Sequence, residues 1–95
     1  MNKRIIAFSP RAKQRLGEIA DYLYSQNLSK AFVINYLEQF EAWLNVLLGQ
    51  FPEPGVLLPE YGDEIRKVVY KKYSFVYRIK SDRIEVLTIF RENLP

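Results

Sequence analysis

The order of its hydrophobic patterns constrains the fold of this chain more than any other sequence feature. Two segments with helical spacing, joined by a short connection, precede three β-rich runs that are separated by turns. Helices connected so closely form an antiparallel hairpin, and strands joined by tight turns form an antiparallel meander. The 95 residues are enough for one domain, which we expect to span residues 1–95.

The first half of the chain carries the helical signals. Lys3–Phe8 predicts a short strand. Ser9 followed by Pro10 is typical of a helix start, with the serine as N-cap and the proline at the first helical position. An apolar stripe then predicts a helix to about Gln26, and a second stripe predicts another helix over Lys30–Leu48.

The second half carries turn formers and then β-formers. Gln50–Gly62 is rich in Pro and Gly and predicts a loop. Glu64–Tyr70, Tyr73–Lys80 and Arg83–Phe90 are rich in Val, Ile, Tyr and Phe and predict strands. The expected fold is α+β in the order β-α-α-β-β-β: an N-terminal strand, an antiparallel helical hairpin, then a three-stranded antiparallel meander.

One face of the predicted sheet mixes apolar residues with arginines. Alternation along the last strand puts Phe90 on the core face, and Leu87 and Ile89 on the opposite face. In the middle strand, Val76 and Arg78 share that second face. A solvated sheet face shows cleaner alternation than this. Because both helices are needed on the first face, little of the chain is left to cover the second, and we expect a partner protein there.

Basic residues gather in two segments. Residues 1–15 carry five basic groups and no acid, residues 16–65 carry eight acids and one lysine, and residues 66–83 carry seven basic groups and one acid. This pattern is either ordinary surface charge that keeps the protein soluble, or a positive face for an anionic partner such as nucleic acid or an acidic protein segment.

Several classes of site are excluded by composition. The chain has no cysteine and no histidine, so disulfides, thiolate metal sites and histidine-dependent triads are excluded. Any catalysis would use Lys, Arg, Tyr, Asp or Glu, and we expect no metal and no cofactor. No apolar run approaches the ~20 residues of a membrane span, and the apolar N-terminal stretch is shorter than the ~7–15-residue core of a signal peptide. We therefore expect a cytoplasmic protein with no membrane partner.

Six segments, taken in chain order, match the pattern of one protein family. They are Ser9–Lys13, Leu16–Leu23, Ile65–Arg66, Tyr73–Ile79, Arg83–Phe90 and Arg91–Pro95. Together they resemble the RelE/ParE-type toxins of bacterial type II toxin–antitoxin modules. The resemblance implies the same β-α-α-β-β-β fold. It also implies one of two targets, because RelE-like members bind the ribosome and cut messenger RNA, whereas ParE-like members poison DNA gyrase.

Two departures separate these branches. The residue after Tyr73 is Ser74, where the RNA-cleaving members tend to carry arginine, and the tail after Phe90 has neither Tyr nor His. We therefore expect the ParE-like branch, a gyrase inhibitor for which no catalytic residue is assigned. One alternative is a metal-independent, ribosome-dependent messenger RNA endonuclease, and another is a partner-binding module without toxicity. In a nuclease, the residues holding phosphate would be Lys71, Lys72, Arg78 and Arg91. The alternative for Lys71 and Lys72 is an ordinary solvated turn without a functional role.

The resemblance also implies a cognate antitoxin, whose C-terminal segment would fold across the mixed face and the helices. The residues expected to contact the antitoxin or the target are Arg66, Val76, Arg78, Arg83, Leu87, Ile89 and Arg91. For Arg66 the alternative is a structural ion pair with Glu18 or Asp21. Arg78 has no acid beside it within its strand, which favours an antitoxin carboxylate as its partner.

Overall fold

The fold is that of a computed structural model, which describes residues 4–48 and 55–91. Its elements are β1 (Ile5–Phe8), α1 (Pro10–Ser25), α2 (Lys30–Leu48), β2 (Val56–Leu57), η1 (Pro59–Tyr61), β3 (Ile65–Tyr70), β4 (Tyr73–Ile79) and β5 (Arg83–Arg91). The predicted α+β order is confirmed, with β2 and the 3₁₀ turn η1 added inside the predicted loop. The predicted start of the first strand, Lys3, lies outside the described residues.

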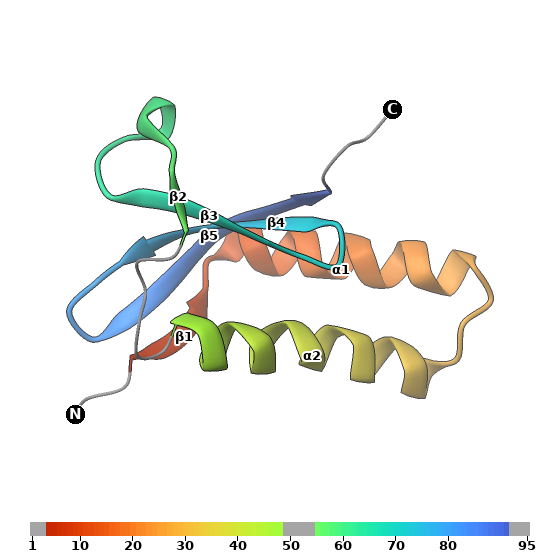
Figure 1. Cartoon of the computed structure of the whole chain (residues 1–95). Helices are drawn as coiled ribbons and strands as arrows, with labels where there is room; N and C mark the ends of the chain where they lie inside the picture. Colours follow the sequence, from red (N-terminus) through yellow and green to blue (C-terminus); the bar gives the residue numbers. More distant parts are fainter. Residues whose placement is uncertain (1–3, 49–54, 92–95) are drawn as a thin grey trace.

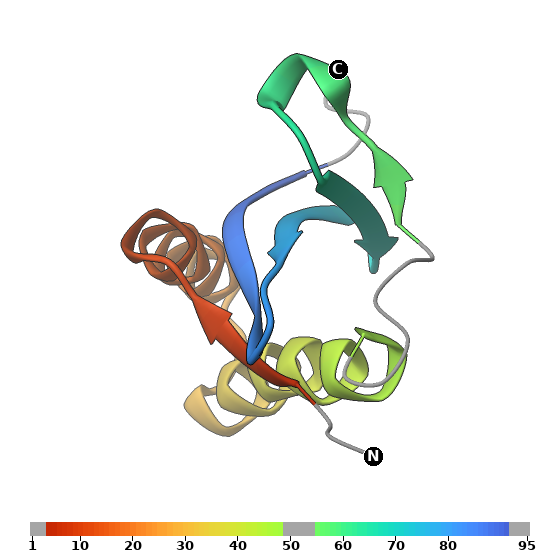
Figure 2. The same cartoon turned by 90° about the vertical axis from the view of Figure 1, so that its left-hand side faces the viewer.

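The strands form one five-stranded sheet in the order β1-β5-β4-β3-β2. β3, β4 and β5 make the expected antiparallel meander, β2 adds to it antiparallel to β3, and β1 pairs parallel to β5. Both helices lie on one face of this sheet, which gives two layers (Figures 1 and 2). The parallel pairing of β1 with β5 is possible because a long stretch of chain, which includes both helices and β2, β3 and β4, connects the two strands.

Side-chain caps start both helices. The Ser9 hydroxyl accepts a hydrogen bond from the Ala12 backbone N–H at 3.0 Å and donates one to the Leu87 carbonyl at 2.7 Å. The Ser29 hydroxyl accepts from the Phe32 N–H at 3.1 Å. The predicted N-cap at Ser9 is thus confirmed, and it also anchors α1 to β5.

Neither helix in the described ranges combines the length and apolar character of a membrane span.

The core lies between the helices and the sheet. Phe40 of α2 is fully buried, and its ring packs edge-on against Phe75 and Tyr73 of β4, with ring centroids 5.2 and 5.6 Å apart. Ala12 and Ile19 bring α1 onto the same cluster. Both predicted apolar stripes therefore face the core, as helical periodicity requires.

A β-bulge in β5 changes which side chains face the core. Val76 of β4 pairs with Thr88, whereas Tyr77 pairs with Val86, so Leu87 is an extra residue in β5. The alternation reverses beyond this point. Ile89 is therefore in the core at 1% exposure, and Phe90 is on the outer face at 37%. The sequence-based placements of Ile89 on the mixed face and Phe90 on the core face are wrong for this reason.

The face away from the helices is partly covered by the chain itself. In Figure 1 the β2–η1 segment stands on the side of the sheet opposite the helices. Tyr61 of η1 lines a hollow there together with Val76, Leu87 and Phe90. Val76 is fully buried. The expectation that little of the chain is left to cover this face is therefore wrong in part, because residues 56–61, inside the predicted loop, lie over it.

Candidate functional site

The second half of β5 is an open sheet edge beside α1. β1 pairs with Arg83–Val86 only. Within the described residues, Leu87–Arg91 therefore pairs with β4 on one side and with no strand on the other. The Leu87 carbonyl accepts the hydrogen bond from the Ser9 hydroxyl, and backbone groups without a partner along such an edge are a template for another strand.

Two hollows lie between α1 and this part of β5, and we call them together the α1–β5 groove. The outer hollow, of about 410 Å³, is lined by Arg11, Arg15, Tyr61, Val76, Leu87, Thr88 and Phe90. The inner hollow, of about 370 Å³, is lined by Arg15, Glu18, Ile19, Tyr22, Tyr73, Ile89, Phe90 and Arg91. Arg15 and Phe90 border both hollows, so they form one continuous surface.

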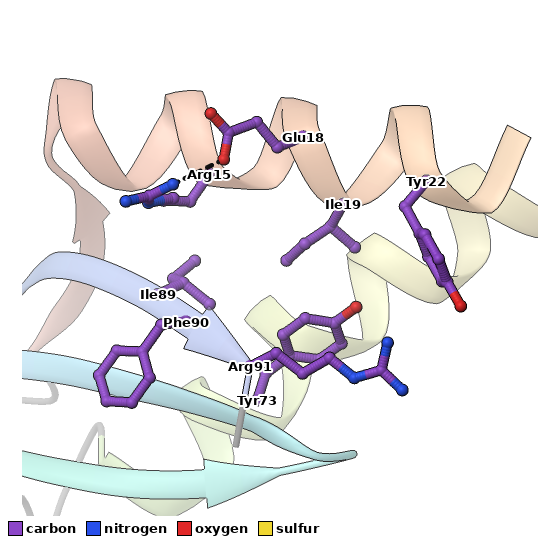
Figure 3. Close-up of a pocket in the computed structure, with 8 residues that line it drawn as sticks. All are labelled: Arg15, Glu18, Ile19, Tyr22, Tyr73, Ile89, Phe90 and Arg91. Atoms are coloured by element: carbon purple, nitrogen blue, oxygen red, sulfur yellow. Dashed lines mark hydrogen bonds and ion pairs between the residues drawn. The ribbon is translucent and has the colours of Figure 1, made fainter. Parts of the chain in front are cut away.

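The groove combines an apolar floor with a basic rim. Tyr61 and Phe90 are 52% and 37% exposed. Arg15 forms an ion pair with Glu18 at 2.8 Å, and both side chains remain open to solvent. Figure 3 shows the side chains of Ile19 from α1 and Ile89 from β5 in the space between the helix and the strand. An amphipathic, acidic segment has the complementary chemistry for this surface.

A third hollow, the tyrosine pocket, continues from the end of the inner one. Its volume is about 330 Å³, and its lining residues are Tyr22, Leu23, Tyr36, Lys71, Lys72, Tyr73 and Arg91. The Arg91 guanidinium lies 5.7 Å from the centroid of the Tyr22 ring. A hydrogen bond with the Tyr22 side chain raises the pKa of Arg91 above its ordinary value. Figure 3 shows Arg91 extending beneath Tyr22 and beside Tyr73.

Aromatic rings hold one lysine of the β3–β4 turn in this pocket. The Lys71 ammonium lies 4.7 Å from the centroid of the Tyr36 ring and 5.5 Å from that of Tyr70. It also donates a hydrogen bond to the Gln39 side-chain oxygen. Lys71 and Lys72 both adopt left-handed backbone conformations, with φ of 52° and 70°. Both lysines are exposed, and the ring and hydrogen-bond contacts of Lys71 distinguish it from an ordinary solvated turn residue.

Two tyrosines of the pocket, Tyr36 and Tyr73, have raised pKa values. Burial raises the pKa of Tyr73 above its ordinary value, and the positive charge of Arg91 opposes part of that shift. Burial also raises the pKa of Tyr36, and the nearby Tyr73 adds to the effect. Both hydroxyls are neutral near pH ~7 and can donate hydrogen bonds to an anion.

The residues proposed for phosphate contact do not all meet. Lys71, Lys72 and Arg91 line the tyrosine pocket. Arg78 lies on the outer face, where the strand register puts it opposite Ile65 and Glu85. The sequence gives Arg78 no acidic neighbour within its own strand, but β-pairing brings Glu85 next to it.

The expected contact residues are likewise dispersed. Val76 and Leu87 line the groove, Ile89 is in the core, and Arg91 is in the tyrosine pocket. Arg66 donates to the Gly55 carbonyl at 2.9 Å. Arg83 forms an ion pair with Asp82 at 3.2 Å.

The Arg66 guanidinium lies at the start of β2, where it donates to the Gly55 carbonyl. Glu18 forms an ion pair with Arg15, and the ion pair of Arg66 with Glu18 or Asp21 stays a prediction. The Gly55 backbone N–H in turn donates to the Tyr77 hydroxyl at 3.1 Å. Arg66 therefore helps to hold the start of β2 against the sheet.

Sequence reasoning did not find Tyr22 and Tyr36 as site residues. Tyr22 falls outside the apolar stripe of α1 and is 46% exposed. A large aromatic residue beside an apolar stripe is the sequence signal that could have identified Tyr22 as a site residue. Arg11 and Arg15 were visible only as part of the basic N-terminal segment. In the part of the chain that the structure describes, no group of three Asp or Glu residues is positioned to hold a metal ion.

The fold and groove can be compared with known proteins. Residues 6–93 match the family described as the ParE toxin of the type II toxin–antitoxin system parDE. The chain belongs to the ParE toxin family. The RelE/ParE resemblance is thus confirmed on its ParE side. A search of curated protein sequences gives no match.

Solved structures similar to this ParE-family toxin confirm its fold. A chain of the chromosomal ParDE toxin–antitoxin system from P. aeruginosa has a TM-score of 0.72 at 18% identity, covering 96% of this chain and 98% of that one. A chain of the RelBE2 toxin–antitoxin complex from Mycobacterium tuberculosis has a TM-score of 0.61 at 15% identity, covering 97% and 94%. The ParE-family toxin thus shares its fold with a chain from each of two toxin–antitoxin systems.

Proposed function

We propose that this ParE-family toxin acts in the cytoplasm by binding and inhibiting DNA gyrase, and that a cognate antitoxin neutralises it. The observation that carries the proposal is the family match over residues 6–93. The outer sheet face supports it. Ser74 is fully buried there, at the position where RNA-cleaving members tend to carry arginine. A buried serine supplies no positive charge to stabilise a cleaving phosphate.

The antitoxin segment is proposed to bind along the α1–β5 groove. Three observations support this location: the open edge over Leu87–Arg91, the exposed apolar rings of Tyr61 and Phe90, and the basic side chains of Arg11 and Arg15. An extended or helical segment with apolar anchors and acidic residues fits that combination. The origin of both structural relatives in toxin–antitoxin systems is consistent with a protein partner.

Supercoiling by purified gyrase tests the target. The chain should inhibit supercoiling, and the antitoxin should restore it. In parallel, the chain is added to a cell-free translation reaction, and the message is mapped by primer extension. Cuts phased with codons, together with undisturbed supercoiling, would replace the gyrase proposal by the endonuclease. Undisturbed supercoiling together with an uncut message would favour a partner-binding module without toxicity.

A matched pair of variants tests the antitoxin site. Phe90→Asp puts a charge on the groove, whereas Val46→Asp puts the same charge on the exposed face of α2, where Val46 is 79% exposed. Phe90→Asp should weaken antitoxin binding at least ~10-fold, which corresponds to about 1.4 kcal/mol. Val46→Asp should leave it unchanged. Equal affinities for the two variants would exclude the groove.

The endonuclease alternative is favoured by one observation. Lys71, Lys72 and Arg91 converge on one pocket with the hydroxyl of Tyr73. Metal-free RNA cleavage needs cations for the phosphate and a proton donor for the leaving oxygen, and these residue types supply both. The primer-extension test above decides between the two activities.

A further inference from the structure

The tyrosine pocket has no role in the gyrase and antitoxin proposals. Three cationic side chains enter it from the β3–β4 turn and the end of β5, and no acid is among its lining residues. Glu18, which lines the neighbouring inner hollow, forms an ion pair with Arg15. Within residues 4–48 and 55–91, the positive charge of the pocket is therefore not neutralised by its own walls.

The backbone conformation of the β3–β4 turn indicates that the side chains of Lys71 and Lys72 have a function. A two-residue hairpin turn with positive φ at both positions is the conformation that Asn-Gly adopts best. Lysine pays a steric cost in the left-handed region, because its Cβ comes close to the following carbonyl oxygen, so Lys71 and Lys72 are poor choices for the turn itself. Strained residues of this kind gather at binding and catalytic sites, where the side chain supplies the compensating function.

Two of the three cations of the pocket are held by contacts with aromatic rings. Lys71 is fixed by the rings of Tyr36 and Tyr70, and Arg91 by the ring of Tyr22. The hydroxyls of Tyr36 and Tyr73 are protonated near pH ~7, as tyrosine hydroxyls ordinarily are, and burial raises the pKa of both further. A preorganised set of donors binds an anion more strongly than mobile surface lysines do, because less side-chain entropy is lost.

We propose that the tyrosine pocket binds a phosphate group. Two ammonium groups, one guanidinium and three hydroxyls offer more donors than the roughly four acceptor sites of a carboxylate, and they suit the oxygens of a doubly charged phosphate. A pocket of about 330 Å³ also leaves room for the substituent of a phosphate ester. The phosphate can come from a free nucleotide or from a nucleic acid strand. The inference holds for either target and depends on neither.

The test is a titration of the isotope-labelled full chain followed by amide NMR at constant ionic strength. The probes are inorganic phosphate, adenosine 5′-monophosphate, and a short single-stranded oligonucleotide with or without a 5′-phosphate. Phosphate should give saturable shifts at Lys71, Lys72, Tyr73 and Arg91. Lys72→Ala should weaken binding about tenfold, the usual effect of one lost charged hydrogen bond.

Lys13→Ala is the matched control, because it removes the same charge from an exposed position on α1. Its affinity should equal that of the unmodified chain. Shifts that do not saturate, or equal weakening by Lys13→Ala and Lys72→Ala, would overturn the proposal. A clear preference for the 5′-phosphorylated oligonucleotide identifies a terminal phosphate, whereas equal binding with a steep salt dependence identifies the strand backbone.

Discussion

Replacing Lys72 with glycine should stabilise the protein, whereas replacing it with alanine should not. Lys72 has a φ of 70°, which an L-residue adopts at a cost and glycine adopts freely. Both substitutions remove the same charge from the tyrosine pocket. The comparison between them therefore isolates the backbone conformation of the turn.

The size of the effect follows from two opposing contributions. The left-handed conformation costs a non-glycine residue roughly 1–2 kcal/mol. Glycine in turn loses about 0.5–1 kcal/mol more conformational free energy on folding than alanine does. The glycine variant should therefore be more stable than the alanine variant by ~0.5–1 kcal/mol. For a chain of this length, that difference raises Tm by ~2–8 °C.

Urea unfolding followed by circular dichroism measures the difference, with equal m-values as the condition for comparing midpoints. In a regular helix or strand, alanine is more stable than glycine, so the expected order here is the reverse of the usual one. An alanine variant as stable as the glycine variant would show that the turn is not strained. Backbone strain would then no longer support a functional role for Lys71 and Lys72.

The remaining predictions concern the bulge, a helix glycine and pH. Ile89→Ala should lower the free energy of unfolding by about 2–5 kcal/mol because Ile89 is in the core. Leu87→Ala should lower it by only ~1 kcal/mol. Similar losses for the two variants in urea unfolding would contradict the bulge. Gly17→Ala should add ~0.5–1 kcal/mol, since a Cβ there meets no atom within 4 Å, and a lower melting temperature would refute this. Burial raises the pKa of Tyr73 above its ordinary value of 10.0, so the unfolded chain loses that proton first. Stability should hold below pH ~10 and fall as the pH rises through the folded-state pKa. Tyr73→Phe should reduce that fall, and an unchanged pH profile would argue against a raised pKa.

Local signals predicted the elements well. Ser9 and Pro10 mark the start of α1 because a side-chain cap and a fixed φ act within a single turn. The bounds of α2, Lys30–Leu48, are those that its apolar stripe predicted. β2 was missed because its two residues, Val56 and Leu57, are too few for a period-2 pattern to register.

The site was less predictable from sequence. Lys71, Lys72 and Arg91 were recognised as candidate phosphate contacts, but as members of a set that also included Arg78. Alternation along each strand assigned the faces, and that rule fails wherever an extra residue enters one strand. Nothing in the residue types around Leu87 signals such an insertion, because a bulge is defined by the partner strand.

The sequence by itself determined the order of helices and strands, the helix starts and the absence of histidine and cysteine chemistry, because these depend on neighbouring residues or on composition alone. Only the tertiary structure decided that Ile89 packs inside, that Phe90 borders a groove, and that Arg91 meets Tyr22 and the turn lysines. Those outcomes depend on the register between β4 and β5 and on where α1 crosses the open edge. Both are contacts between residues far apart in the chain, and no local pattern encodes them.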